Sequence, residues 1–398
     1  MKYTVCAVTG SRAEFGILLP LLLRLNDCPE IEFRLAVTGS HLSTAYGHTL
    51  DEIRRTGLPI HARIPLPLGE GDDKAHMIQA AGAAMSAFAD YFSAHRPDLL
   101  VVLGDRYEIF AVSAAAAMLG IPIAHLHGGE TTEGAVDEFL RHSITKMSYL
   151  HFVSCEAYRR RVIQLGEAPE RVFNVGALST ENCLRTPLLS VEELSESLQF
   201  DLTAEPYSVV TFHPVTLEDN TAERQLHELI AAMDAFPAMS YIVTLANADA
   251  GGRAINAIWQ AEGASRKNWL VMPSLGMRRY LSALKGAEMM LGNSSSGITE
   301  APAMHIPTVN IGDRQKGRMR AESVIDCPPE RAAVTAAMKK AMTPEFKAIA
   351  ANTVSPFGDG HTSEKILSEL LRFLRSAPHN TKKTFYDLPD SRSINPAL

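Results

Sequence analysis

The chain has 398 residues, of which 46% are hydrophobic and 21% charged, values typical of a soluble globular protein with two or three domains. Its net charge of −7 excludes nucleic acid as the main partner, because binding a phosphate backbone requires a concentrated basic surface. No stretch approaches the roughly 20 consecutive apolar residues of a membrane-spanning helix, and the N-terminus lacks the pattern of a secretory signal, so we expect a cytoplasmic protein without membrane contact.

Short apolar runs alternate with helical patterns along the whole chain. The runs in the first half are Tyr3–Gly10, Phe33–Gly39, Asp98–Asp105, Ile121–Gly129, Tyr149–Cys155 and Val172–Ala177. Those in the second half are Tyr207–Pro214, Ser240–Asn247, Asn268–Ser274, Ala287–Ser294, Pro307–Asp313 and Glu322–Cys327. The segment Leu99–Leu103 is apolar on both faces, which is typical of a central parallel strand. The alternation predicts an α/β fold with parallel sheets covered by helices on both faces.

The same pattern divides the chain into two halves. Each half carries about six strand-and-helix units, enough for one Rossmann-like domain. We predict one doubly wound domain in residues 1–187 and a second in 188–362, because the segment 185–206 is a helical pattern bracketed by prolines. Residues 363–376 form an amphipathic helix that is expected to cross back to the first domain, and 377–398 form a polar tail. Two such domains with a cleft between them are the layout of GT-B enzymes, although a fold alone does not determine the chemistry.

Candidate ligand contacts are the residues that directly follow each predicted strand, because ligands of open parallel sheets bind outside the carboxyl ends of the strands. After the first strand, the turn at Gly10 leads into a helix whose backbone N–H groups are suited to bind an anion. Arg12 in the same turn offers a bidentate contact to phosphate. The alternative is an ordinary strand-to-helix turn with a surface arginine. The Gly-x-Gly-x-x-Gly pattern of dinucleotide binding is absent.

An acidic residue, Asp105, directly follows the buried run Leu99–Leu103. A carboxylate behind a buried strand loses solvation unless it is paired, which leaves two interpretations. Asp105 either caps the next helix or acts as a catalytic carboxylate that faces the cleft. Arg106 beside it is expected to hold phosphate or to keep the acid ionised.

The run Ile121–Gly129 ends in a dense group of ionisable residues. His125 and His127 are two residues apart, so we expect both on one face of the strand. Two glycines then allow close approach to a ligand before Glu130, and Asp137 follows. Such clustering is typical of acid/base sites, with a purely structural role as the alternative. We predict no metal, because His-x-His lacks further ligands at recognisable spacing and the five cysteines are scattered without a Cys-x-x-Cys pair.

The second half repeats the pattern at its own strand ends. His213 ends one strand and is suited to act as an acid, a base or a donor to phosphate, although a lone histidine there is as often structural. Asn247 ends the next strand and is expected along the same edge. Further contacts are predicted in a Gly/Ser turn that opens a helix, where N–H groups and hydroxyls suit a diphosphate. These residues are Ser294, Ser295, Ser296 and Gly297, with Glu300 one turn later and Arg314 after the next strand.

Glu300 has two interpretations at this stage. Its spacing from the serines is that of a capping box, in which a glutamate returns to the start of its own helix. A carboxylate in the same place is also suited to bind the two hydroxyls of a ribose.

Together, these motifs resemble the hydrolysing UDP-N-acetylglucosamine 2-epimerases, which open sialic acid synthesis. No single motif is specific, but the set occurs in order over nearly the whole chain. The segments that carry the resemblance are Thr9–Gly16, Thr38–Leu42, Gly104–Arg106, His127–Glu130, Asp137–Glu138, Arg141–Lys146, His213–Thr216, Gly292–Gly297 with Glu300, and Phe385–Asp387.

The resemblance implies a GT-B fold, a UDP-sugar substrate and a reaction without metal or NAD. Elimination of UDP across C1–C2 gives a 2-acetamidoglucal, and addition of water then gives N-acetylmannosamine. It implies that Asp105, Asp137 and the carboxylates around Glu130 supply acid/base groups, and that His213 lies near the leaving phosphate. It also implies UDP contacts from Arg12, Ser294, Ser295 and Glu300, and by analogy a homodimer or homotetramer.

The sequence departs from the family pattern at His127. Some members carry a glutamate there, in a Glu-Gly-Gly-Glu run, so the residue that removes the C2 proton stays open between His127 and Glu130. A similar group of enzymes acts on UDP-2,4-diacetamido-2,4,6-trideoxyglucose, and no residue decides between the two substrates. The motifs differ from those of the non-hydrolysing epimerases. A GT-B glycosyltransferase and a non-enzymatic binder of sugar nucleotides are the remaining alternatives.

Overall fold

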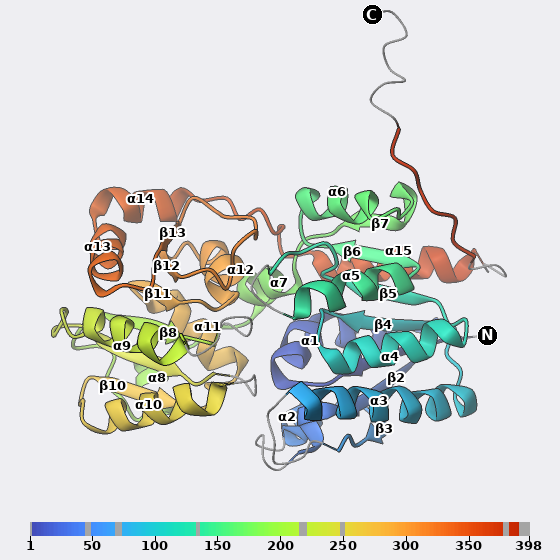
Figure 1. Cartoon of the computed structure of the whole chain (residues 1–398), viewed down its shortest axis with the longest axis horizontal. Helices are drawn as coiled ribbons and strands as arrows, with labels where there is room; N and C mark the ends of the chain where they lie inside the picture. The colour runs from blue at the N-terminus through green and yellow to red at the C-terminus, as the bar shows by residue number, and fades with distance from the viewer. Residues whose placement is uncertain are drawn as a thin grey trace, which may run out of the picture.

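A computed structural model of the protein describes residues 2–43, 49–67, 74–132, 136–214, 221–246, 251–376 and 382–389. These residues form two lobes, each built on a parallel sheet with helices on both faces (Figure 1). The predicted α/β class, with two doubly wound Rossmann-like domains in a GT-B-like layout, is confirmed. None of the described helices is long and apolar enough to cross a lipid bilayer.

The first lobe contains a seven-stranded sheet of order β3-β2-β1-β4-β5-β6-β7. Its strands are β1 (Tyr3–Thr9), β2 (Ile31–Thr38), β3 (Ile60–Ile64), β4 (Leu99–Leu103), β5 (Ile123–Leu126), β6 (Leu150–Val153) and β7 (Val172–Asn174). Its helices are α1 (Arg12–Asp27), α2 (Leu50–Arg55), α3 (Lys74–Ala94), α4 (Tyr107–Met118), α5 (Asp137–Met147), α6 (Glu156–Gln164) and α7 (Leu178–Arg185). All five residues of β4 are buried, as its apolar sequence predicts for a central strand.

Strand β3 was absent from the sequence prediction, which expected about six strands in this half. Its sequence, Ile-His-Ala-Arg-Ile, alternates apolar and polar residues, and only Ile64 is fully buried. The strand lies at the edge of the sheet and pairs only with β2 among the described strands. An edge strand needs no continuous apolar run, which explains why a search for such runs missed it.

The second lobe contains a six-stranded sheet of order β10-β9-β8-β11-β12-β13. Its strands are β8 (Tyr207–Thr211), β9 (Ser240–Thr244), β10 (Trp269–Met272), β11 (Met289–Gly292), β12 (Thr308–Ile311) and β13 (Val324–Cys327). The helices that follow α7 are α8 (Val191–Leu198), α9 (Ala222–Met233), α10 (Gly252–Ala264), α11 (Met277–Gly286), α12 (Ser296–Ala303), α13 (Arg331–Ala341), α14 (Pro344–Asn352) and α15 (Thr362–Arg375).

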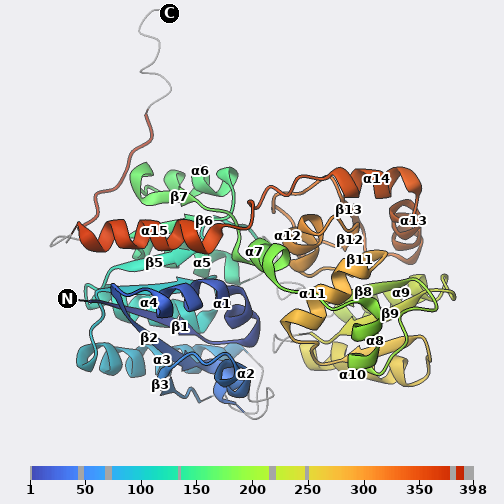
Figure 2. The same cartoon turned by 180° about the vertical axis from the view of Figure 1, so that it is seen from behind.

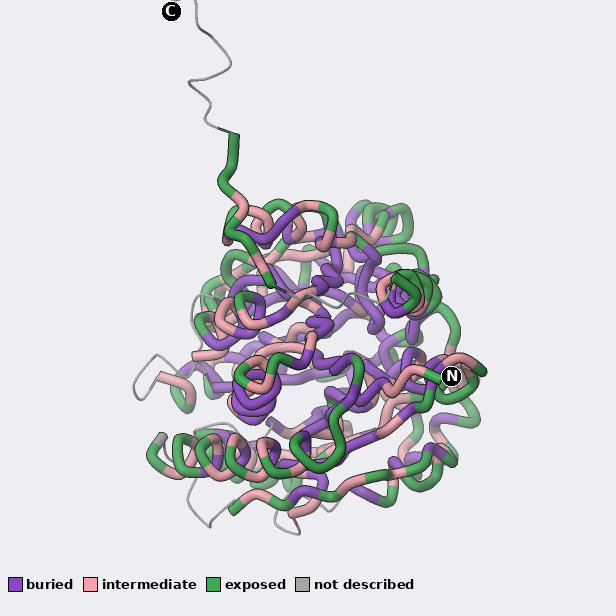
Figure 3. The backbone as a smooth tube through the Cα atoms, turned by 90° about the vertical axis from the view of Figure 1, so that its right-hand side faces the viewer, coloured by how far each residue is buried: buried purple, intermediate pink, exposed green. Residues whose placement is uncertain are grey.

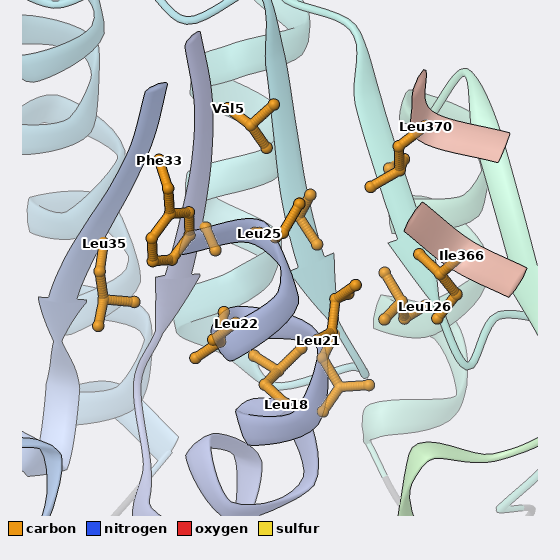
Figure 4. Close-up of a cluster of buried hydrophobic side chains, with 14 of the residues drawn as sticks. Val5, Leu18, Leu21, Leu22, Leu25, Phe33, Leu35, Leu126, Ile366 and Leu370 are labelled. Carbon is orange, nitrogen blue, oxygen red and sulfur yellow. The ribbon is translucent and has the colours of Figure 1, made fainter. Parts of the chain in front are cut away.

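The C-terminal helix α15 belongs spatially to the first lobe, although it follows the second lobe in the chain (Figure 2). Its Ile366 and Leu370 join the apolar cluster formed by Leu18 and Leu21 of α1 and Val5 of β1 (Figure 4). Buried backbone is concentrated in the sheets, and exposed residues lie on the outer sides of the helices (Figure 3). The chain therefore crosses between the lobes twice, once after α7 and once before α15.

A buried polar network fixes α15 beside these crossings. The carboxylate of Glu181 in α7 accepts hydrogen bonds from the backbone N (2.6 Å) and Oγ (2.5 Å) of Ser363 at the start of α15. The Oγ of Ser363 also accepts a hydrogen bond from Arg24 Nε of α1 at 2.7 Å. A carboxylate at a helix N-terminus accepts hydrogen bonds from the N–H groups there and interacts favourably with the helix dipole. This network joins α1, α7 and α15.

Candidate active site

A cavity of about 520 Å³ lies between the lobes, where strand ends of both sheets face each other. Eleven of the predicted site residues line it: Arg12, Asp105, Arg106, His127 and Glu130 from the first lobe, and His213, Ser294, Ser295, Ser296, Glu300 and Arg314 from the second. Gly10, Asp137 and Gly297 are not among the lining residues. The predicted contact Asn247 lies outside the residues that the structure describes. Acidic and basic side chains of the first lobe therefore line the same cavity as the Gly/Ser turn of the second lobe.

Asp105 lies two residues beyond the end of β4, after Gly104, and pairs with Arg141 of α5. Arg141 is almost completely buried and also contacts Glu138 Oε2 (2.8 Å) and the backbone oxygen of Glu130 (2.9 Å). Its fourth partner is Thr132 Oγ1, at 2.8 Å. Asp105 makes no cap on α4, whose N-cap is Arg106 without a side-chain cap bond, so the cleft-facing interpretation is the one that the geometry supports.

Charge on the surrounding arginines keeps Asp105 ionised. Burial alone would raise the pKa of Asp105, but Arg141, with smaller effects from Arg318 and Arg106, outweighs burial and lowers the pKa below its usual 3.8. Glu138 behaves similarly: burial opposes ionisation, and hydrogen bonds and Arg141 lower its pKa to about 2. At neutral pH the guanidinium of Arg141 is therefore held between two carboxylates.

Glu130 takes part in a contact between the two lobes. Its Oε2 lies 3.1 Å from Arg318 Nη2 of the second lobe, and Arg318 Nε donates to the backbone oxygen of Thr131 at 3.3 Å. Its Oε1 accepts a hydrogen bond from Ser154 Oγ at 3.2 Å and lies 3.4 Å from His127 Nδ1. The side chains of Glu130 and Arg318 are only 7% and 11% exposed, so this ion pair is largely shielded from solvent.

The prediction that His125 and His127 share one face of a strand is wrong. Strand β5 ends at Leu126, and His127 adopts a left-handed backbone conformation with φ of 64°. His125 is buried, with Nε2 2.8 Å from the backbone oxygen of Gly104 and Nδ1 3.2 Å from Thr145 Oγ1. Burial lowers its pKa to about 3, so the ring is neutral and structural. His127 instead lines the cavity.

The first turn of α1 is arranged differently from the anion cradle that was expected. The backbone N–H of Gly10 donates to Glu14 Oε2 at 3.0 Å, so it is not available to a ligand in this conformation. A Cβ at Gly10 would lie 2.7 Å from Glu108 Cγ, which explains the need for glycine. Burial raises the pKa of Glu14 well above its usual value. Arg12 and Ser11 of this turn line the cavity.

In the second lobe, Asn293 positions the residues that follow β8 and β12. Its Oδ1 accepts a hydrogen bond from the backbone N of His213 at 2.7 Å, and its Nδ2 donates to the backbone oxygen of His213 at 2.8 Å. The backbone oxygen of Asn293 accepts from Arg314 Nη1 at 3.1 Å and from Gln315 Nε2 at 2.8 Å. Asn293 therefore links three strand ends, through its side-chain amide to His213 and through its backbone oxygen to Arg314, and both of these residues line the cavity.

The Gly/Ser turn opens α12 toward the cavity, as predicted. The N-cap residue Ser295 makes no side-chain cap bond, and Glu300 is hydrogen bonded to the hydroxyl of Ser296, so the capping-box interpretation of Glu300 is wrong. The hydroxyl of Tyr280 in α11 donates to Ser296 Oγ at 2.7 Å. Burial raises the pKa of Glu300. The backbone N–H groups of Ser296 and Gly297 already donate within the turn, to Ser294 Oγ at 3.3 Å and to the backbone oxygen of Ser294 at 3.2 Å, so they are not the free donors that were expected. The turn presents hydroxyls and a carboxyl group to the cavity.

One predicted contact, Gly297, has mainly structural surroundings. A Cβ at Gly297 would lie 2.7 Å from Thr308 Cγ2, so glycine allows α12 to pack closely on β12. Asp137 is the first residue of α5, one helical turn before Arg141 and therefore on the same side of the helix.

The residues that line the cavity but were not site candidates in the sequence analysis include Arg141, Tyr280 and Arg318. Arg141 and Tyr280 lie on helices, and Arg318 lies in a loop beyond Arg314, so none of them directly follows a strand. Within the described residues, no group of three or more His, Cys, Asp or Glu side chains is arranged to hold a metal ion.

Comparison with known proteins gives a consistent set of relatives. A family model described as UDP-N-acetylglucosamine 2-epimerase matches residues 23–371. The chain is 39% identical to polysialic acid biosynthesis protein P7 of Escherichia coli over 96% of this chain and 97% of that protein. It is 40% identical to the GDP/UDP-N,N'-diacetylbacillosamine 2-epimerase (hydrolyzing) of Campylobacter jejuni, over 87% and 89% of the two chains. The fold is similar to that of a crystal structure of UDP-GlcNAc 2-epimerase from Neisseria meningitidis bound to UDP-GlcNAc, with a TM-score of 0.78, 18% identity, and 93% and 100% of the chains covered.

Proposed function

The chain belongs to the UDP-N-acetylglucosamine 2-epimerase family, and from this premise we propose that it is a hydrolysing 2-epimerase. Its substrate is UDP-N-acetylglucosamine, and its products are UDP and N-acetylmannosamine. The observation that carries the proposal is one cavity with two chemically different walls. Asp105 and Glu130 form one wall, and the turn Ser294–Ser296 with Glu300 forms the other.

The second lobe is suited to hold the UDP part of the substrate. The diphosphate lies against the N-terminus of α12, where the hydroxyls of Ser294 and Ser295 meet it and the helix dipole favours its negative charge. Glu300 accepts hydrogen bonds from the ribose hydroxyls. His213 and Arg314, both positioned by Asn293, lie on the same wall and balance the charge of the departing diphosphate.

The first lobe is suited to carry out proton transfer at the sugar. In the elimination step, the C2–H and C1–O bonds break, the electron pair of C2–H becomes the C1=C2 double bond, and UDP leaves. Water then adds its oxygen to C1 and a proton is placed on C2. Asp105 and Glu130, which both line the cavity, supply the acid and base groups for these steps, and such groups typically contribute 10²–10⁴-fold each. Arg12 and Arg106 contact the phosphates from this side.

A second candidate substrate is UDP-N,N'-diacetylbacillosamine, which is UDP-2,4-diacetamido-2,4,6-trideoxyglucose. The observation that favours it is the 40% identity to a Campylobacter jejuni protein named for that sugar. The two substrates differ at C4 and C6 of the sugar, and both undergo the same elimination and hydration. The assignment of roles to Asp105 and Glu130 is therefore the same for either.

Product analysis with each sugar nucleotide alone tests the proposal. We expect the purified protein to release UDP and N-acetylmannosamine from UDP-N-acetylglucosamine with no sugar acceptor present. If UDP is released only from the diacetamido sugar nucleotide and not from UDP-N-acetylglucosamine, the second candidate is the substrate. Turnover only after an acceptor is added would indicate a glycosyltransferase, and tight UDP binding without turnover of either sugar would indicate a binding protein.

A further inference from the structure

The tail segment, residues 382–389, lies against the first lobe and not in the cavity between the lobes. It contains Phe385–Asp387, one of the segments that carry the family resemblance, yet none of its residues lines the cavity. It contacts the C-terminal end of α5 and the loop 165–167, which follows α6. The reaction proposed above gives this segment no role.

Lys383 of the tail segment holds the C-terminal end of α5. Its ammonium group donates to the backbone oxygens of Lys146 (2.8 Å) and Ser148 (2.6 Å) and to Glu167 Oε1 (2.8 Å). An ammonium group has three N–H donors, so all three are used. The last carbonyls of a helix lack partners within it, and the helix dipole favours a cation there. Lys383 therefore satisfies the end of α5, although 237 positions separate it from Lys146.

A second set of contacts joins the same three parts of the chain. The backbone N of Tyr386 donates to the backbone oxygen of Gly166 at 3.0 Å, and a Cβ at Gly166 would overlap the ring of Phe385. Lys146 Nζ lies 5.0 Å from the centroid of that ring, within the range of a cation–π contact, and donates to Glu167 Oε1 at 2.7 Å. The side chain of Glu167 is completely buried. The tail segment, the loop 165–167 and the end of α5 therefore form one cluster.

The other end of α5 belongs to the candidate active site. Arg141 pairs with Asp105 and donates to the backbone oxygen of Glu130. It lies five residues before Lys146, which is about 7.5 Å along the helix axis. A shift of the C-terminal end of this short helix therefore moves Arg141, and with it the carboxylate of Asp105. A displacement of about 1 Å at a reacting group can cost about 100-fold in rate.

We propose, on the basis of the function proposed above, that the tail segment fixes α5 and that Lys383 is a positioning residue for Asp105. It acts through α5 and Arg141 and touches no substrate. Its loss should therefore lower kcat and leave UDP binding unchanged, because UDP is held by the second lobe.

Two variants of the tail segment test this role in the full-length protein. Lys383→Gln removes the cation, and Phe385→Ala removes the ring without changing the charge. We expect each to lower kcat of UDP release about tenfold, with KM and UDP affinity within about threefold of wild type. Hydrogen–deuterium exchange of the α5 amides should rise at least about tenfold, while that of α4 stays within about twofold. The matched control is Lys339→Gln, which removes one positive charge from an exposed position on α13 of the second lobe and should change neither quantity.

The possible results separate this role from a general effect on stability. Wild-type kcat in both K383Q and F385A refutes the positioning role. A lower kcat with equal rises of exchange in α4 and α5 refutes it as well, because that pattern indicates a general loss of stability. A K339Q variant as slow as K383Q would assign the loss to net charge and would also refute it. A wild type that is inactive on both candidate sugar nucleotides refutes the proposed function instead, and the exchange of α5 in K383Q then decides whether the tail segment fixes this helix.

Discussion

Replacing Asp105 by asparagine separates the chemistry of its carboxylate from its role as a partner of Arg141. The structure offers a matched control, because Glu138 pairs with the same guanidinium but does not line the cavity. Asp105→Asn and Glu138→Gln each remove one negative charge and keep an oxygen that can accept from Arg141. Their side chains are similarly exposed, at 23% and 25%.

The structural cost of either change follows from the contacts of Arg141. Breaking a buried ion pair outright costs about 3–5 kcal/mol, because a buried charge is left without compensation. In each variant one carboxylate remains, together with the backbone oxygen of Glu130 and Thr132 Oγ1. We therefore expect a loss of about 1.5–3 kcal/mol in either case, as for hydrogen bonds to charged groups, and a decrease in Tm of about 2–4 °C per kcal/mol.

The catalytic cost should differ sharply between the two variants. Loss of a proton-transferring group lowers kcat by about 10²–10⁴-fold, so D105N should be nearly inactive, whereas E138Q should retain at least about a tenth of the wild-type rate. Initial rates of UDP release, UDP affinity by calorimetry and Tm by differential scanning calorimetry make the comparison. Equal losses of kcat in both variants at equal Tm would show that Asp105 acts only through Arg141, and the reasoning would be refuted.

Three further predictions concern UDP binding and stability. Glu300→Gln should weaken UDP binding about tenfold, as measured by calorimetry, because an amide offers the ribose one acceptor in place of two; unchanged affinity would argue against the ribose contact. Hydrogen bonds from His151, Lys146 and Lys383 outweigh burial and lower the pKa of Glu167 to about 2. The usual pKa of a glutamate is 4.5, so ionised Glu167 contributes up to about 3 kcal/mol to the free energy of unfolding above pH 4.5, and this contribution is lost as the pH falls toward 2. Tm should therefore fall more steeply over that range in wild type than in Glu167→Gln. Gly292→Ala should lower Tm far more than Gly276→Ala, since both have positive φ but only a Cβ at Gly292 meets backbone, at 2.0 Å; equal decreases would contradict this steric argument.

The sequence predicted the parts of the fold that depend on continuous apolar runs. The buried strands β1 and β4, the alternation with helices and the two lobes are all present. The predictions that failed concern features that depend on tertiary contacts. Strand β3 is held by its pairing with β2, and a half-exposed edge strand has too little apolar sequence to be recognised.

The site residues that directly follow strands were brought together as the topology of parallel sheets requires. Asp105 and Ser294 come from different sheets, yet both line the cavity. Arg141 and Arg318 could not be found in this way, because Arg141 lies on a helix and Arg318 in a long loop, so neither directly follows a strand. The pairing of Glu130 with Arg318 depends on how the lobes meet, which no local pattern in either half encodes.

Local geometry also explains where detailed interpretations were wrong. A period of two predicts a shared face for His125 and His127 only if the strand continues, but β5 ends between them and the backbone turns left-handed. The spacing of Glu300 would allow it to cap the start of its own helix. In the structure Glu300 is instead hydrogen bonded to Ser296, whose hydroxyl also accepts a hydrogen bond from Tyr280. Sequence spacing gives the candidates, and packing decides among them.

The most direct test of the central claim is the isotopic composition of the sugar released by the wild-type protein in D₂O. The claim is that side chains of the first lobe remove the C2 proton while the second lobe holds UDP. It predicts UDP and N-acetylmannosamine in equal amounts, with one deuterium at C2 of every sugar molecule formed, as read by proton NMR and mass spectrometry. A product that retains the original hydrogen at C2 would contradict elimination at this site and the roles assigned to the residues around it.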